Sequence, residues 1–152
     1  METGIKVGDC MKTSLVTIRE DASIVEAARK MKQSNVGSLL VEDKNKRVYG
    51  ILTSDDVVHK AVSAEKTAEP VKNFASKPLV GIKIDADLRD AAKLMGERNV
   101  KRLVVFKTDG KSIAGIISQK DIVRISPSLY DLIAERERIT EGGLTGRRAQ
   151  RA

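Results

Sequence analysis

The chain has few of the residues that build metal sites, disulfide bonds and base-stacking surfaces. Its single cysteine, Cys10, and its single histidine exclude an internal disulfide and a Cys/His metal cluster. It has no tryptophan, and 3% of its residues are aromatic, which argues against a surface that stacks single-stranded nucleic acid. No apolar run approaches the roughly 20 residues of a membrane span, and residues 1–7 lack the apolar core of a secretory signal. We therefore expect a soluble, cytoplasmic protein.

The charge of the chain is basic, with 28 Lys and Arg residues against 21 Asp and Glu residues and a net charge of +7. A basic chain attracts anionic partners, but this balance does not distinguish a nucleotide from a nucleic acid or an acidic protein. His59 has no Ser or Cys in a nucleophile context, and Asp55 and Asp56 are neighbours that point in different directions on a helix. We expect no enzyme activity, no cofactor and no metal.

An internal repeat is the strongest signal in the sequence. The segment Leu15–Ile18 returns 64 residues later as Leu79–Ile82, and Gly50–Asp56 returns 65 residues later as Gly115–Asp121. A unit of roughly 60 residues buries a core that gives it only marginal stability alone. We therefore expect two copies that pack on each other and leave a pseudo-symmetric groove between them.

Each copy predicts the order strand, helix, strand, strand, helix. In the first copy, Ser23 and Glu26 form the pattern of a capping box at a helix start. The second copy repeats the device, with Asp87 as the cap and Asp90 three residues on. Apolar residues at helical spacing follow each cap, and two apolar runs joined by a polar turn then predict a hairpin. The other predicted elements are strands at 15–18, 39–41, 49–52, 79–82, 103–106 and 113–117 and short helices at 54–60 and 119–125.

These patterns describe an α+β pair of repeats followed by a tail. A further helix is expected to begin at Ser126-Pro127, because proline is tolerated at the first helical position, and its apolar stripe extends to about Ile139. From Glu141 onward the apolar content is too low for the chain to fold by itself. The expected boundaries are 7–62 for the first repeat, 63–70 for a linker, 71–125 for the second repeat, and 126–152 for a C-terminal helix and flexible basic tail.

Each copy ends in the motif Gly-apolar-apolar-(Ser/Thr)-x-x-Asp, at the junction of a buried strand and a helix. Glycine weakens a strand, and one reason to retain it is the close approach of a ligand or another backbone. The Ser or Thr lies at a helix start, where free N–H groups favour an anion, and the Asp can accept two hydrogen bonds from the diol of a ribose. Thr53-x-x-Asp56 and Ser118-x-x-Asp121 are equally capping boxes that need no ligand. The residues alone leave both interpretations open.

The duplicated unit with this motif at its end resembles a pair of CBS domains, the tandem called a Bateman module, over residues 7–125. The resemblance implies two β-α-β-β-α repeats packed through their sheets, with two clefts between them. It implies a non-catalytic regulatory module that binds an adenosine-containing ligand there, AMP, ADP or ATP ahead of S-adenosylmethionine, and acts on an unknown partner protein. It also implies a homodimer, because members of the family assemble four copies into a disc.

The resemblance assigns ligand-binding roles to residues of both copies. Thr53 and Asp56 would hold the ribose in the first cleft, with the adenine against the backbone of Pro78–Val80. Ser118 and Asp121 would hold the ribose in the second cleft.

The second cleft is completed by residues that lie elsewhere in the sequence. Its adenine would lie against the backbone of Thr13–Val16 and near Gly37, and Lys101 and Arg102 match the positions from which basic family members reach phosphates. Because the first copy has Gly37 and Ser38 at those positions, the two clefts should differ. The candidate ligand-binding residues are Thr13, Ser14, Val16, Gly37, Thr53, Asp56, Pro78, Val80, Lys101, Arg102, Ser118 and Asp121.

Two alternatives remain open. In the first, the chain is associated with nucleic acid, its tail arginines contact phosphates, and the CBS pair supplies only a dimer. In the second, it is a structural dimerisation module with empty clefts. The tail arginines are Arg136, Arg138, Arg147, Arg148 and Arg151.

Overall fold

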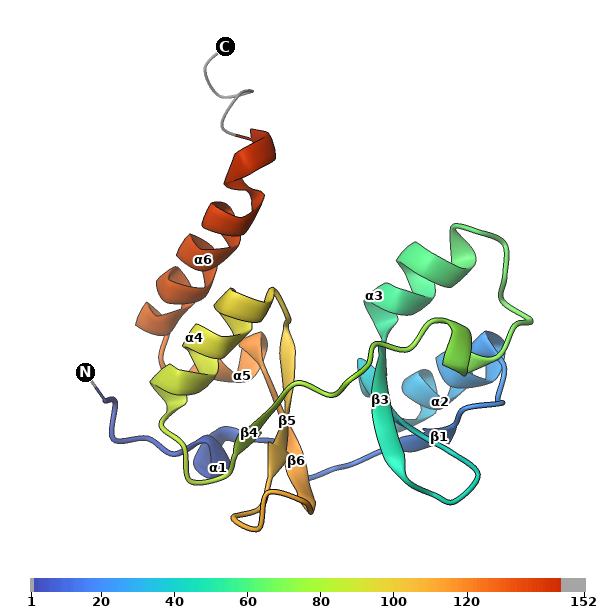
Figure 1. The fold of residues 1–152 in the computed structure, drawn as a ribbon, viewed down its shortest axis with the longest axis horizontal. Helices are drawn as coiled ribbons and strands as arrows, with labels where there is room; N and C mark the ends of the chain where they lie inside the picture. The colour runs from blue at the N-terminus through green and yellow to red at the C-terminus, as the bar shows by residue number, and fades with distance from the viewer. Residues whose placement is uncertain (1, 146–152) are drawn as a thin grey trace. The chain divides into compact units, whose positions relative to one another are not determined.

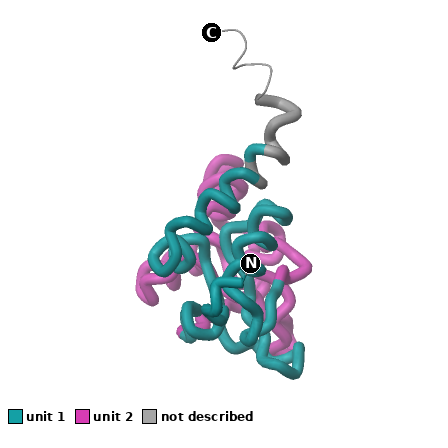
Figure 2. Tube along the Cα trace, turned by 90° about the vertical axis from the view of Figure 1, so that its left-hand side faces the viewer, with its two compact units in different colours: residues 1–13, 81–152 teal, residues 14–80 magenta. Residues whose placement is uncertain are grey.

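The computed structural model describes residues 2–145 of the chain (Figure 1). The chain divides into two compact units, which Figure 2 distinguishes by colour. Unit 2 is the continuous segment Ser14–Val80, and it holds the sheet of the first repeat. Unit 1 combines the chain up to Thr13 with the chain from Gly81 onward, and it holds the sheet of the second repeat. Residues 7–13, which begin the first repeat in the sequence, therefore belong to the unit that holds the sheet of the second repeat.

Unit 2 contains a three-stranded sheet and the helices of the first repeat. In chain order its elements are β1 (Thr17–Arg19), α2 (Ile24–Ser34), β2 (Ser38–Glu42), β3 (Val48–Thr53), α3 (Ser54–Asp56), the π-helix η1 (Val57–Val62) and the 3-10 helix η2 (Val71–Asn73). Strand β2 lies in the middle, parallel to β1 and antiparallel to β3. The predicted order of elements is confirmed.

Unit 1 repeats this plan and adds a helix at each end. Its elements are α1 (Val7–Cys10), β4 (Gly81–Lys83), α4 (Leu88–Arg98), β5 (Arg102–Phe106), β6 (Ile113–Ser118), α5 (Gln119–Ile125) and α6 (Ser128–Thr145). Strand β5 lies between β4, to which it is parallel, and β6, to which it is antiparallel. Helix α6 packs along α4 and α5.

The central strand of each sheet is apolar along its whole length. In β2, the side chains of Leu39, Leu40 and Val41 are at most 1% exposed, although successive residues point to opposite faces of a sheet. The range Leu103–Val105 in β5 is buried to the same degree. Each sheet is therefore covered on both faces at its centre, which explains why these strands read as continuous apolar runs.

The predicted cap of α2 is confirmed. The Glu26 amide donates to the Ser23 hydroxyl at 3.1 Å, and the Ser23 amide donates to the Glu26 carboxylate at 3.2 Å. The helix ends at Asn35, whose backbone is left-handed with φ 51°. The equivalent residue of α4, Asn99, has φ 52°, so both helices stop by the same device.

Asp87 caps α4, as predicted, and also anchors the start of the chain. Its carboxylate accepts hydrogen bonds from the Arg89 amide at 2.8 Å, the Gly4 amide at 3.0 Å and the Thr3 hydroxyl at 2.9 Å. Burial raises the pKa of Asp87, but these hydrogen bonds outweigh burial and hold the pKa at about 2. The carboxylate therefore stays ionised and links residues 3 and 4 to the second repeat.

A segment of the other repeat borders the outer strand of each sheet. In unit 1, Lys12 and Ile116 exchange amide–carbonyl hydrogen bonds of 2.9 and 3.0 Å. In unit 2, Ser76 and Ile51 exchange bonds of 2.9 and 3.1 Å. Lys12 and Ser76 are themselves 64 residues apart, so the duplication extends to these bordering segments.

Two groups of elements differ from the sequence-based predictions. Strands β1 and β4 begin at Thr17 and Gly81, two residues after the predicted starts. Val16 contributes its carbonyl to the Leu40 amide but lies outside the ladder. The predicted helix at 54–60 is α-helical only to Asp56 and continues as η1 to Val62.

The C-terminal helix is longer than predicted. Helix α6 passes Ile139, its predicted end, and ends at Thr145, so residues 141–145 are helical. Leu129 and Ile133 are buried and anchor the helix, and a helix once started adds a hydrogen bond for each further residue that it orders. The rest of the predicted tail lies outside the described residues. Like the other helices in residues 2–145, α6 is not long and apolar enough to cross a membrane.

Candidate functional site

The turn between β3 and α3 is built by the first copy of the motif. Thr53 is the N-cap of α3, and its hydroxyl accepts the Asp56 amide at 3.1 Å. The Asp56 carboxylate accepts the Thr53 amide through Oδ2 at 2.9 Å. Asp56 is only 8% exposed. The capping interpretation is therefore confirmed for this copy, and it fixes one oxygen of a nearly buried carboxylate.

The turn between β6 and α5 repeats this geometry. Ser118 caps α5 by accepting the Asp121 amide at 3.3 Å, and Asp121 Oδ2 accepts the Ser118 amide at 2.9 Å and its hydroxyl at 3.0 Å. Asp121 is 2% exposed. The second carboxylate is thus held by one more hydrogen bond than the first and is more deeply buried.

A cation one turn along the helix faces the other oxygen of each carboxylate. Lys60 Nζ lies 2.9 Å from Asp56 Oδ1, and Arg124 Nη1 lies 3.9 Å from Asp121 Oδ1. These two cations were not among the predicted site residues, although opposite charges three or four residues apart are neighbours on a helix. Each motif therefore presents Oδ1 beside a positive charge, while Oδ2 is used by the cap.

The glycine of each motif is explained by the bordering segment. A Cβ atom at Gly115 would lie 2.5 Å from the Lys12 carbonyl oxygen, and one at Gly50 would lie 3.0 Å from the Ser76 carbonyl oxygen. Of the two reasons considered for these glycines, a ligand or another backbone, the structure shows a backbone.

The two capped turns differ in the residues beside them. In unit 2, the Gly37 carbonyl accepts the amide of the residue after Thr53, and Ser38 pairs with Thr53 across the sheet. In unit 1, Lys101 and Arg102 occupy these places, with Arg102 directly opposite Ser118. Two basic residues therefore flank the second turn, where the first has Gly and Ser.

A comparison with known families identifies the two repeats that contain these turns. The sequence profile of the CBS domain matches the chain twice, over residues 7–63 and 71–128. The chain belongs to the CBS domain family. Each match contains one of the two capped turns, so the resemblance seen in the motif is confirmed and the chain is a tandem CBS pair.

Known proteins are similar to this chain in sequence and in fold. An uncharacterised 17.7 kDa protein of Acidianus ambivalens is 35% identical over 119 residues, which cover 78% of this chain and 71% of the relative. A CBS domain protein of unknown function from Thermoplasma acidophilum has a TM-score of 0.77 at 23% identity, over 88% of this chain and 76% of that one. A CBS domain protein from Pyrobaculum aerophilum, solved with AMP, has a TM-score of 0.72 at 22% identity, over 86% and 99% of the two chains. The two solved structures establish the fold.

The boundary between the units of the CBS pair falls inside one predicted binding segment. Thr13 belongs to unit 1 with Ser118 and Asp121, whereas Ser14 and Val16 belong to unit 2. Thr13 and Ser14 are exposed, and Val16 packs against the core of unit 2. The role of this segment beside an adenine stays a prediction.

The other predicted adenine contacts belong to unit 2. Pro78 is exposed and Val80 is half-buried, and both share the unit of Thr53 and Asp56, with which the family resemblance groups them. Gly37 also belongs to unit 2, where it contacts the first capped turn, although we assigned it to the cleft of the second motif. These assignments remain predictions.

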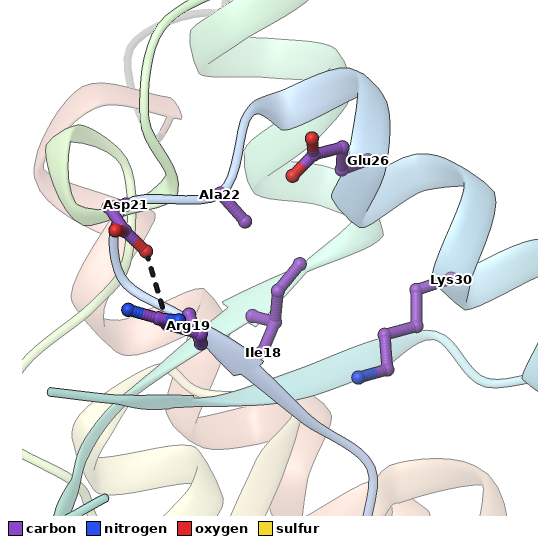
Figure 3. A pocket seen from close by; sticks show the side chains of 6 residues that line it. All are labelled: Ile18, Arg19, Asp21, Ala22, Glu26 and Lys30. Carbon is purple, nitrogen blue, oxygen red and sulfur yellow. Dashed lines mark ion pairs between the residues drawn. The ribbon is translucent and has the colours of Figure 1, made fainter. Parts of the chain in front are cut away.

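A separate open pocket of about 450 Å³ lies beside β1 and α2 of unit 2 (Figure 3). Arg19 and Asp21 form an exposed ion pair of 3.5 Å at its edge, and Glu26 and Lys30 reach toward it from α2. The pocket contains none of the predicted ligand-binding residues. Its charges are of both signs and solvated, which makes it a weak anion site.

The remaining predictions concern Cys10, metal ions and the basic tail. Cys10 is buried, and burial, followed by the charges of Asp9 and Asp121, raises the pKa of its thiol. Within residues 2–145 no three His, Cys, Asp or Glu side chains gather to hold a metal ion. The tail residues Arg147, Arg148 and Arg151 lie outside the described part of the chain.

Proposed function

We propose that this CBS pair is a non-catalytic sensor that binds an adenine nucleotide, AMP, ADP or ATP ahead of S-adenosylmethionine, in clefts formed by its repeats. One observation carries the proposal. The chain holds two buried, pre-oriented carboxylates, Asp56 and Asp121, in equivalent capped turns. Buried charges that are fixed before a ligand arrives bind it at a lower entropic cost.

The geometry suggests how each turn would hold a ribose. Oδ2 of each Asp completes the cap, so Oδ1 is the oxygen that would accept ribose hydroxyls. Lys60 and Arg124 lie beside that oxygen and could shift toward the ligand. Capping and ligand binding would then use different oxygens of the same side chain.

The difference between the turns favours the second as the phosphate-binding site. Lys101 and Arg102 flank Ser118 and Asp121, and basic side chains bind phosphate by charge-assisted hydrogen bonds. The AMP complex of the Pyrobaculum aerophilum protein, which has the same fold, supports an adenine nucleotide as the ligand. We therefore assign phosphorylated ligands to the turn of Asp121 first.

The regulatory mechanism would be linkage between ligand and conformation. A nucleotide held by both repeats would stabilise one arrangement of the repeats, and a partner protein that binds this arrangement would respond. A coupling free energy of about 1–3 kcal/mol suffices. We also propose that the protein acts as a homodimer and in the cytoplasm.

Equilibrium binding of AMP, ATP and adenosine tests the phosphate assignment. The variant Lys101→Ala/Arg102→Ala should weaken AMP and ATP by roughly tenfold to a hundredfold, the effect of losing a hydrogen bond to a charged group, and adenosine much less. The control Lys107→Ala/Lys111→Ala removes the same charge from the exposed turn before β6 and should leave all three affinities unchanged. Equal weakening of all three ligands by the first variant would show that Lys101 and Arg102 do not contact phosphate.

A further inference from the structure

Unit 2 has an exposed apolar groove between α2 and η1. The groove has a volume of about 280 Å³, and Val25, Ala28, Val57 and Val62 are among its lining residues. Val25 is 38% exposed and Val62 is 50% exposed, although both are β-branched apolar residues on helices. Exposed apolar surface gathered in one groove is typical of a site that another element covers.

The equivalent groove of unit 1 is filled by a helix of the same chain. Helix α6 packs along α4 and α5, the counterparts of α2 and of α3 with η1 (Figure 1). Ala92 and Gly96 of α4 are buried, whereas the residues at the same places in α2, Ala28 and Lys32, are exposed. The duplicated fold thus uses this groove as the seat of a helix, and unit 2 lacks that helix among the described residues.

The charge at the groove indicates which kind of helix fits it. Arg29 and Lys32, one turn apart on α2, are both lining residues and both exposed. Two copies of the groove placed face to face would bring these cations together, which is unfavourable. A helix with acidic residues one turn apart would instead complement them.

Helix α6 has such a surface on the side that faces away from α4 and α5. Leu129 and Ile133 face the unit, and Tyr130, Asp131, Ala134 and Glu135 form an opposite strip, which we call the α6 strip. Tyr130 is 49% exposed, and Asp131 and Glu135 are exposed and four residues apart. The strip therefore combines an aromatic side chain with two acidic ones.

We propose that the groove between α2 and η1 binds the α6 strip of a second copy of this chain. Tyr130 would enter the apolar groove, and Asp131 and Glu135 would face Arg29 and Lys32. Because each copy has one groove and one strip, two such contacts can close a symmetric pair. This inference deepens the proposed homodimer and is independent of nucleotide binding.

Charge reversal on each side of the contact tests the proposal by sedimentation at micromolar concentration. Arg29→Glu/Lys32→Glu and Asp131→Lys/Glu135→Lys change only exposed side chains, so the fold should persist, and circular dichroism checks it. Each variant alone should dimerise at least about tenfold more weakly than the wild type. An equimolar mixture of the two should recover a dimer, because each contact in the mixed pair joins opposite charges.

Lys30→Glu/Lys44→Glu is the matched control, because it reverses two exposed cations of unit 2 outside the groove. It should dimerise like the wild type. The proposal is overturned if the wild type is monomeric, if the two test variants dimerise normally, or if their mixture fails to pair. AMP affinity measured on the same samples tests the sensor function separately. A monomer that binds AMP normally would refute only the contact between copies. A dimer that does not bind AMP would refute only the sensor function.

Discussion

Substituting Gly115 tests the bordering segment, the least expected feature of the fold. In the open middle of a strand, Gly→Ala should stabilise by about 0.5–1 kcal/mol, because glycine loses more backbone freedom on folding. At Gly115 the new methyl group would lie 2.5 Å from the Lys12 carbonyl oxygen and 2.8 Å from the Met11 sulfur. The backbone of residues 11 and 12 must therefore move, and we expect the opposite sign.

The size of the effect follows from the hydrogen bonds at risk. Lys12 and Ile116 share two of them, at 2.9 and 3.0 Å, and each contributes about 0.5–1.5 kcal/mol. Gly115→Ala should thus lower the free energy of unfolding by about 1–3 kcal/mol. Gly50→Ala should cost less, because its methyl group would lie 3.0 Å from the nearest atom, the Ser76 carbonyl oxygen.

Urea unfolding measures both variants, and amide exchange shows where the effect arises. Exchange at Lys12 and Ile116 should accelerate in Gly115→Ala, while exchange at Ser76 should not change. If Gly115→Ala is as stable as the wild type and the Lys12 amide remains protected, the close approach of the bordering segment is wrong.

Two further predictions concern titrating side chains of unit 1. Because the folded pKa of Asp87 is about 2, below its ordinary value, the stabilisation that Asp87 provides is complete above about pH 4 and is lost as the pH falls toward 2. Asp87→Asn should flatten that part of a urea-unfolding pH profile and speed amide exchange at Thr3 and Gly4. An unchanged profile would show that the carboxylate does not hold the N-terminal residues. Burial, followed by the charges of Asp9 and Asp121, raises the pKa of the Cys10 thiol. Iodoacetamide at pH 8 should therefore alkylate the folded protein far more slowly than the urea-unfolded protein, and Asp9→Asn should speed the reaction. Rapid labelling of the folded protein would contradict the burial of Cys10.

The sequence was sufficient wherever the signal was local. The cap at Ser23, the two hairpins and the capped turns at Thr53 and Ser118 each depend on residues within one or two turns of each other. The internal repeat added weight, because the same local signals occur twice. Family membership then followed from the repeated motif.

The pairing of each sheet with its bordering segment could not be predicted in this way. Lys12 pairs with Ile116, which is far away in the chain, and no pattern at either residue names the other. The glycine at 115 signalled a close approach, but it did not say whether a ligand or a backbone was approaching. The length of α6 was also missed, because composition alone ended the helix at Ile139 and its packing on α4 was not visible.

Ligand-induced thermal stabilisation is the most direct test of the sensor function. AMP at about 100 times its dissociation constant should stabilise the wild type by about 2.7 kcal/mol. Asp121→Ala should lower the stability of the free protein by about 0.5–2 kcal/mol, through loss of the cap, and should also abolish most of the stabilisation by AMP. Asp56→Ala is the matched comparison in the turn without flanking basic residues. This variant should retain more of the stabilisation by AMP. If AMP, ADP, ATP and S-adenosylmethionine all fail to stabilise the wild type, the account is contradicted.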